Sequence, residues 1–199
     1  MKTTILTLAI ALSTVFGISK SASAASHNEE VTNLTEVTRI SKIEVRGNIE
    51  LYISDGVKDQ AKVYNHYYTE NALVQDQDGV LRITSYSAQK LVVWVTVSDL
   101  REISAYDNAA VKSFGKLSAL DIDVKLHDQA LAQLDLDAYE ARVTLSGKSK
   151  ADLSGNIEQG SVKYDRSAYL NVSKLTAANV TKTITTFKGC VCHDELASL

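Results

Sequence analysis

VKLHDQALAQL is the sequence of residues 124–134, and its pattern occurs four times in the chain. Similar segments begin at positions 103, 143 and 162, so the first interval between repeats is slightly longer than the next two. In each segment apolar or small residues alternate with polar ones, on both sides of a polar turn. Alternation with a period of two is typical of β-strands, and a repeat of about 20 residues predicts the stacked coils of a β-solenoid. An antiparallel meander with evenly spaced strands is the alternative.

Aligned positions keep their residue class from one repeat to the next. A single coil cannot bury its inner face alone, so we expect these positions to stack and close a common core. The inward columns are predicted to be Ile103, Val124, Val143 and Val162, and, two residues further on, Ala105, Leu126, Leu145 and Tyr164.

Shorter strands are predicted before the repeats. In VRGNIELYISDG, residues 45–56, two alternating runs flank Gly47-Asn48, and we predict a hairpin that opens the solenoid. Asp78-Gly79 is a turn signal between two extended runs. Residues 91–97, LVVWVTV, are apolar on both faces through Val92 and Trp94, which predicts a strand buried on both sides.

The N-terminus has the features of an export signal. Lys2 precedes a short apolar run, and Ala22-Ser23-Ala24 fits a small-x-small cleavage site, so residues 1–24 are predicted to be a signal peptide. We expect the mature protein to begin at Ala25 or Ser26. Residues 25–38 are polar and are predicted to be a flexible lead-in. No later segment is apolar enough to cross a bilayer as a helix.

Composition supports an exported β-protein and argues against a nucleic-acid binder. Proline is absent, and the formal net charge of −3 becomes −5 once the signal peptide with Lys2 and Lys20 is removed. Nucleic-acid-binding domains usually carry a basic surface. About 175 residues remain, enough for one domain with a substantial core.

The chain resembles the bacterial family described as putative auto-transporter adhesin, head GIN domain. The likeness rests on Gly47-Asn48-Ile49, on DGVLRI at 78–83, on VTVSDLREISA at 95–105 and on the repeats. It covers about residues 38–185, and we place a single domain at 39–187. The resemblance implies an all-β, right-handed, largely parallel solenoid and no catalytic residues. The family's usual Ser-Gly-Ser-Gly turns are reduced here to Ser146-Gly147.

One turn column contains the residue types of a hydrolytic triad. It reads Tyr106, His127, Ser146 and Asp165. A triad needs the histidine between the nucleophile and the acid, and stacking would instead place Ser146 in the middle. We therefore predict a solvated turn edge with no catalytic residue.

The neighbouring turn column contains two carboxylates. Asp107 and Asp128 would lie on adjacent coils, but Ca²⁺ takes six to eight oxygen ligands, so we predict no metal or other cofactor. Four further aspartates alternate with the inward Ile122 and Leu136 and are expected on outward strand faces; they are Asp121, Asp123, Asp135 and Asp137.

The C-terminal tail, residues 188–199, contains Cys190, Cys192 and His193. An exported pair of cysteines favours a disulfide, within or between chains. A bridge across one residue would be strained, so free thiols are an alternative, and the three side chains make only half of a zinc site.

Exposed tyrosines give the main indication of an interaction surface. Tyrosine offers contact area together with a polar tip, although it is also common in strands. The candidate binding residues are Tyr106, Asp107, His127, Asp128 and Tyr169.

We predict an exported, non-catalytic protein of adhesin or binding type, periplasmic, outer-membrane associated or extracellular, with an envelope or extracellular protein or glycan as its partner. One alternative is a β-solenoid enzyme acting on polysaccharides, for which Asp128 and Arg166 are the nearest candidates. The other is an envelope assembly or stress factor that binds a partner chain at a sheet edge.

Overall fold

The computed structural model describes residues 31–34, 39–64 and 72–185, and this part of the chain consists of β-strands and no helix. The signal peptide, most of the lead-in and the tail with Cys190 and Cys192 lie outside the described residues. The strands are β1 (Val31–Leu34), β2 (Lys42–Gly47), β3 (Ile49–Asp55), β4 (Gln60–Tyr64), β5 (Ala72–Gln77), β6 (Val80–Ser85), β7 (Leu91–Val97), β8 (Glu102–Tyr106), β9 (Ala110–Leu126), β10 (Leu131–Leu145), β11 (Lys150–Asp165) and β12 (Tyr169–Thr185).

The four repeats are neighbours in the sheet and run parallel. Val124 on β9 is paired with Ile103 on β8 and with Val143 on β10, which in turn is paired with Val162 on β11. Ala105, Leu126, Leu145 and Tyr164 form a second column in the same way. Both predicted columns are confirmed, and the antiparallel meander is wrong for this part of the chain.

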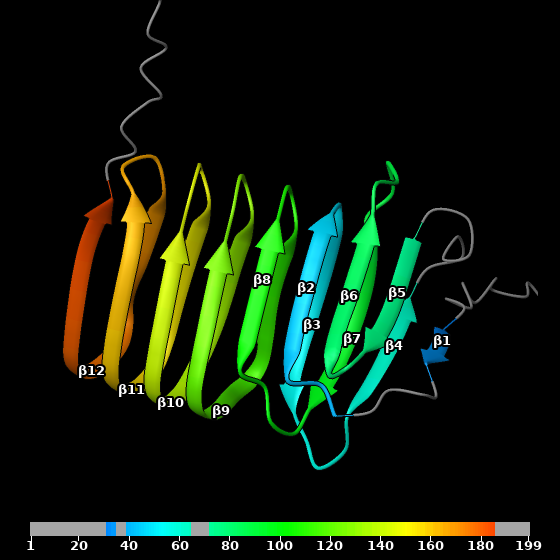
Figure 1. The fold of residues 1–199 in the computed structure, drawn as a ribbon, viewed down its shortest axis with the longest axis horizontal. Helices are drawn as coiled ribbons and strands as arrows, with labels where there is room; N and C mark the ends of the chain where they lie inside the picture. Colours follow the sequence, from blue (N-terminus) through cyan, green and yellow to red (C-terminus); the bar gives the residue numbers. More distant parts are fainter. Residues whose placement is uncertain (1–30, 35–38, 65–71, 186–199) are drawn as a thin grey trace, which may run out of the picture.

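The sheet curls because β9 to β12 each run through two layers (Figure 1). The first part of β9 pairs with β3 between Ala110 and Ser113, and its last part pairs with β8 between Asp123 and Leu126. We call the layer that contains β6, β2, β8 and the last parts of β9 to β12 the front layer. The rear layer contains β7, β3 and the first parts of β9 to β12.

The predicted hairpin at Gly47-Asn48 is wrong. β2 pairs with β6 and β8 in the front layer, whereas β3 pairs with β7 and β9 in the rear layer. The turn is therefore a corner that takes the chain from one layer to the other. Gly47 has φ 94°, and a Cβ added there would lie 2.0 Å from the carbonyl oxygen of Ser85, so the corner requires glycine.

Antiparallel strands at the N-terminal end make the sheet mixed. β1 pairs antiparallel with β4, β4 with β7, and β5 with β6. The predicted turn at Asp78-Gly79 joins β5 to β6 and is confirmed, with φ 53° and 78°. β1 falls within the predicted lead-in. A wholly parallel solenoid is thus too simple a description of the fold.

The core lies between the two layers and is built from alternate residues. Leu91, Val93 and Val95 of β7 are at most 1% exposed, whereas Val92 and Trp94 between them are half-buried. The prediction of burial on both faces of β7 is therefore wrong, because no layer among the described residues covers its outer face. Ile122 and Leu136 are buried as predicted, and the aspartates beside them face outward.

The C-terminal edge is open within the described residues. β12 pairs only with β11, and Val180 and Ile184 on it are 42% and 55% exposed. It lies at the opposite end of the sheet from β1, β4 and β5 (Figure 1).

Candidate functional site

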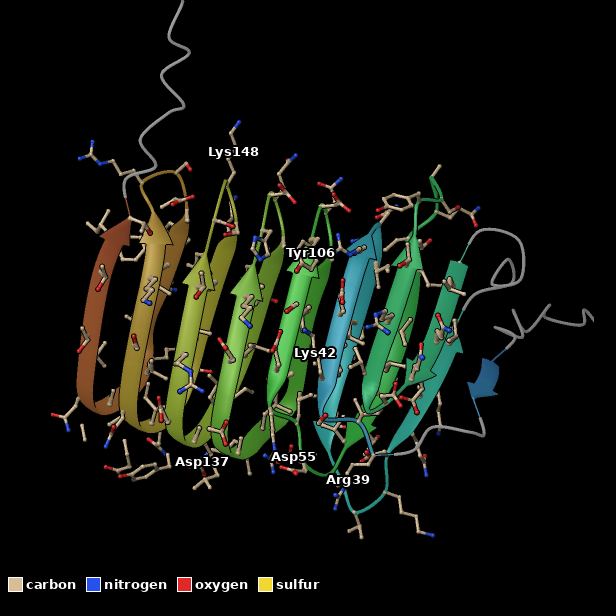
Figure 2. All side chains as sticks on the ribbon, in the orientation of Figure 1. Arg39, Lys42, Asp55, Tyr106, Asp137 and Lys148 are labelled. Carbon is tan, nitrogen blue, oxygen red and sulfur yellow. The ribbon has the colours of Figure 1, made fainter. Side chains whose placement is uncertain are left out.

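The turns between the repeats form one edge of the molecule, at the top of Figure 2, where Tyr106 and Lys148 are labelled. Asp107, Asp128 and Gly147 occupy equivalent turn positions with φ of 59°, 61° and 68°. Aspartate tolerates this left-handed conformation better than most residues, which accounts for its use at positions equivalent to Gly147. The backbone N–H of Gln129 donates to the Asp107 carbonyl at 3.0 Å, so successive turns are hydrogen-bonded to one another.

The predicted turn column forms a continuous ladder of side chains. The Tyr106 and His127 rings are stacked, with centroids 4.6 Å apart and an angle of 4° between them. The Arg46 guanidinium covers the other face of Tyr106, 3.9 Å from its centroid. Ser146 Oγ lies 2.8 Å from His127 Nδ1. Tyr106 and His127 are therefore half-buried, and each ring covers one face of the other.

The ladder lacks the geometry of a hydrolytic triad. Asp165 Oδ2 accepts a hydrogen bond from the N–H of Gly147 at 3.0 Å. Ser146 thus separates Asp165 from His127 along the column, as the repeat spacing predicted, whereas a triad has its histidine in the middle.

The contact between the two turn aspartates joins the carboxylate of one to the backbone of the other. Asp128 Oδ2 accepts a hydrogen bond from the N–H of Asp107 at 3.4 Å. Within the described residues, no group of three or more His, Cys, Asp or Glu side chains could hold a metal ion. Tyr169, the remaining candidate, lies apart from these turns at the start of β12 and is 57% exposed.

The outward face of the front layer is occupied by ion pairs. Glu102 accepts from Lys42 at 2.9 Å and from Lys125 at 3.2 Å. Figure 2 shows Lys42 on this face. Burial alone would raise the pKa of Glu102, but hydrogen bonds from Lys42, Ser104 and Lys125 together hold that pKa below its ordinary value. The face is therefore charged and internally paired.

The rear layer carries an aromatic cluster on its outward face, made of Tyr52, Trp94 and Phe114. Tyr52 on β3 and Trp94 on β7 are paired in register, and their rings are stacked with centroids 4.7 Å apart. Phe114 on β9 approaches Trp94 edge-on, at 5.4 Å and 60°. Phe114 is 65% exposed, so one side of this cluster is open to solvent.

Glu50 fixes the side chains beside the cluster. Its Oε1 accepts from Lys112 Nζ at 2.6 Å and from the Tyr52 hydroxyl at 2.8 Å. These two hydrogen bonds, with the charge of Lys112 and Lys90, lower the pKa of the Glu50 carboxyl. The Glu50 hydrogen bond correspondingly raises the pKa of Lys112. Tyr52 is thereby held in the orientation that stacks on Trp94.

A polar groove of about 430 Å³ continues from the cluster along the rear layer. It begins at Ser113, next to Phe114, and crosses β10, β11 and β12. Gln133, Asp152 and Asn171 line it as an in-register row. Asn171 Nδ2 donates to Asp152 Oδ1 at 2.8 Å.

Sequence reasoning missed both the cluster and the groove, although the repeat spacing contained a signal. The paired positions advance from Lys112 to Lys116 on β9 but only from Gln133 to Asp135 on β10. Two additional residues of β9 therefore lie in a bulge that contains Phe114. This bulge is the reason why the interval between the first two repeats is longer than the intervals that follow.

Comparisons with known proteins agree with this architecture. The family model described as "Putative auto-transporter adhesin, head GIN domain" matches residues 39–187. None of the curated proteins compared with the chain matches it. Within the described residues, the structure also contains no helix long and apolar enough to span a membrane.

Solved structures with a similar fold include proteins from two Parabacteroides species. A putative adhesin from Parabacteroides merdae has a TM-score of 0.59 at 15% identity, with 78% of this chain and 77% of that chain covered. A second putative adhesin, from Parabacteroides distasonis, has a TM-score of 0.58 at 16% identity, with 79% of each chain covered. A putative lipid binding protein from the same species has a TM-score of 0.54 at 10% identity, covering 80% and 79%. At these identities the likeness concerns the fold.

Proposed function

The chain belongs to the auto-transporter adhesin head GIN domain family, and we propose that it is an exported, non-catalytic binding protein of the cell envelope or cell surface. In this proposal the rear layer is the binding surface. The strands provide a rigid, regular support, and the aromatic cluster of Tyr52, Trp94 and Phe114 provides the contact.

We further propose that the curled sheet is a right-handed β-solenoid whose first strands act as a cap. The parallel register of β8 to β12 supports this, because each strand is displaced by about one repeat from the last. The antiparallel strands β1, β4 and β5 would then close the N-terminal end of the core. Terminal caps of this kind are required in repeat proteins, since each coil buries its inner face only against a neighbour.

The observation that carries the proposed function is the exposure of Phe114. Large apolar side chains on the surface are unremarkable when they are isolated. Phe114 instead extends an ordered aromatic pair, and it sits in a bulge that displaces two residues from the regular strand. β-bulges frequently re-aim a side chain beside a functional site. Aromatic residues are enriched in the contacts that dominate binding energy.

The geometry of the turn edge supports a non-catalytic role. Asp165 is engaged by the N–H of Gly147 and is separated from His127 by Ser146. Arg166 and Asp128, the nearest candidates for polysaccharide cleavage, are exposed turn residues on non-adjacent repeats. This edge offers stacked and hydrogen-bonded side chains in place of a nucleophile with its base.

Binding of a partner chain at a sheet edge is a second candidate, favoured by the unpaired outer side of β12 among the described residues. An extended segment adds to such an edge through backbone hydrogen bonds. Binding by this route would depend on β12 and would be insensitive to Phe114, which lies on β9.

The experiment compares two variants of the exported full chain in binding to envelope material from its source organism. Phe114→Ala removes the exposed ring, and Leu120→Ala is the matched control, because Leu120 is 76% exposed on the same strand. We expect Phe114→Ala to weaken binding about tenfold and Leu120→Ala to bind as the wild type does. Equal binding by both variants would show that the ligand binds another surface, such as β12. If the wild type does not bind, the proposal is wrong.

A further inference from the structure

We propose that the ligand of the rear layer is a neutral polysaccharide. One sugar ring would pack against Phe114 and Trp94, and the hydroxyl groups of the following units would bind along the polar groove. This inference rests on the proposed function, because it names the ligand class of the same surface.

The groove and the aromatic cluster form one continuous surface. Lys112 is paired with Tyr52 on one side and with Gln133 on the other, so the row of the cluster is also the row of the groove. The row continues through Asp152 to Asn171. The groove volume of about 430 Å³ lies within the range of ligand sites, about 300–1,000 Å³.

The spacing of the row suits a repeating ligand. Neighbouring strands lie about 4.8 Å apart, so Gln133, Asp152 and Asn171 recur at that interval along the groove. The advance per unit of an extended hexopyranose chain is similar. Successive sugar units would therefore meet successive strands in the same relative position.

The chemistry of the row matches hydroxyl groups, which both donate and accept. The Asp152 carboxylate accepts one hydrogen bond from Asn171 and retains further lone pairs. The Asn171 carbonyl oxygen accepts from the N–H of Ser173 at 3.1 Å. Gln133 is exposed and offers both an amide donor and a carbonyl acceptor. Carboxylate acceptors bind hydroxyl donors more strongly than neutral acceptors do.

The charge of the groove disfavours acidic ligands. Among the described residues, the charged side chains that line it are those of Asp135, Asp152 and Lys174. A uronate polymer or a nucleic acid would bring further negative charge against these carboxylates. A peptide is also disfavoured, because the backbone groups of β10 and β11 are already paired on both sides. Neutral sugar hydroxyls are not repelled by the carboxylates and do not need free backbone groups.

Two irregularities in the sheet coincide with the groove, and the second of them is separate from the bulge that contains Phe114. The register between β9 and β10 changes between Gln133 and Asp135, and that between β11 and β12 changes between Asp152 and Ser154. Gly155 lies beside this region with φ 101°, and a Cβ there would lie 2.0 Å from the Leu136 carbonyl oxygen and 2.6 Å from Asp135 Oδ1, so the two strands approach closely at this point. The sheet is thus irregular at the groove, where a regular strand pairing would leave a flat surface.

The test uses the single tryptophan of the chain, Trp94, as a reporter at the site. Exported full-length protein is titrated with cellopentaose, mannopentaose and xylopentaose as neutral probes, and with tetragalacturonate as the acidic comparator. We expect a saturable change in tryptophan emission with at least one neutral probe, affinity that increases with chain length from disaccharide to pentasaccharide, and at least tenfold weaker binding of tetragalacturonate.

Variants then assign the site, with affinities measured by calorimetry because Phe114 contacts the reporter. Phe114→Ala and Asp152→Ala should each weaken binding about tenfold, since they remove ring packing and a charged acceptor respectively. Asp152→Asn preserves the shape and an acceptor for Asn171, and should weaken it less. Leu120→Ala and Asp121→Ala, on the bend and the front layer, should bind as the wild type does.

The outcomes separate this inference from the proposed function. If no neutral probe binds while Phe114-dependent binding to envelope material persists, the glycan inference is wrong and the binding function stands. Protease-sensitive envelope binding in that case would identify a protein partner. Equal or tighter binding of tetragalacturonate would also overturn the inference. If the control variants lose as much affinity as Phe114→Ala, the ligand binds elsewhere and the assigned site is wrong.

Discussion

Lys182 on β12 is paired in register with Val162 on β11, so a lysine occupies the last position of an otherwise apolar inward column. It borders a small apolar cavity of about 100 Å³ that opens between the ends of the two layers. Charged residues that point inward on an edge strand are a common defence against edge-to-edge association. Lys182 has the position and the charge to oppose such association at β12.

We therefore expect Lys182→Val to promote self-association through β12. The substitution completes the apolar column and leaves the backbone edge unchanged. Sedimentation velocity over a range of protein concentrations should show larger species for Lys182→Val than for the wild type. Lys163→Val is the control, because Lys163 lies on the neighbouring strand with its side chain exposed on the outer face. Identical sedimentation of both variants and the wild type would contradict the role of Lys182.

Two glycines with positive φ should differ in their response to alanine. Gly47 and Gly115 have φ of 94° and 83°, but a Cβ would lie 2.0 Å from Ser85 O at the first and meet nothing within 4 Å at the second. Gly115→Ala should lower the free energy of unfolding by about 1–2 kcal/mol through backbone strain alone. Gly47→Ala should cost about 1–3 kcal/mol more, because the corner must shift. Urea denaturation of both variants measures the difference, and equal losses would mean that the corner is not tightly packed.

Ser149 occupies an inward turn position and is fully buried, with no hydrogen-bond partner for its hydroxyl among the described residues. The equivalent positions in the neighbouring repeats are Ala130 and Ala168. Ser149→Ala should therefore raise the free energy of unfolding by about 1 kcal/mol, because an unsatisfied buried hydroxyl is removed.

Ser104→Ala is the matched comparison, since Ser104 is 2% exposed but donates to Glu102 Oε1 at 2.9 Å. It should lower the free energy of unfolding by about 1 kcal/mol. Thermal or chemical denaturation gives both values. Destabilisation by Ser149→Ala would show that its hydroxyl has a partner in solution.

Stability at acidic pH should depend on Glu50. Hydrogen bonds from Lys112 and Tyr52 lower the pKa of Glu50 in the folded protein, whereas an unfolded glutamate titrates near about 4.3. The unfolded state therefore binds the proton first as the pH falls, so this contribution to stability is complete at neutral pH and is lost progressively below about pH 4.3.

Glu50→Gln should accordingly show a weaker fall in melting temperature between pH 5 and pH 3 than the wild type. Tyr52→Phe, which removes one of the two hydrogen bonds to Glu50, should be intermediate. Melting curves recorded in parallel across this range test the prediction. Parallel pH profiles for all three proteins would show that Glu50 has the same pKa in both states.

The repeats and their columns could be predicted from the sequence alone. The segments alternate with a period of two and recur at nearly constant intervals. Their apolar positions are buried when equivalent positions stack, which places Val124 between Ile103 and Val143. The turn at Asp78-Gly79 was equally local, because the two turn residues carry the required positive φ themselves. The order of Tyr106, His127 and Ser146 along the turn edge followed from the same columns.

The pairing of the two strands that flank Gly47 could not be predicted from the local sequence. The local sequence fits a hairpin, but β2 and β3 find their partners in β6, β8, β7 and β9, and these lie far away in the sequence. Strand pairing depends on which surfaces are buried together, and a short alternating segment does not encode its partner. For the same reason the sequence did not predict that the first strands are antiparallel or that Trp94 is partly exposed.

The candidate site also required the tertiary structure. Tyr52, Trp94 and Phe114 come from β3, β7 and β9 and meet only because those strands are neighbours in the rear layer. The longer first repeat indicated an insertion but not which side of the strand it would displace. Alternation predicts whether a side chain points in or out, whereas the partners on the outer face are set by strand order and by bulges, and these are properties of the folded sheet.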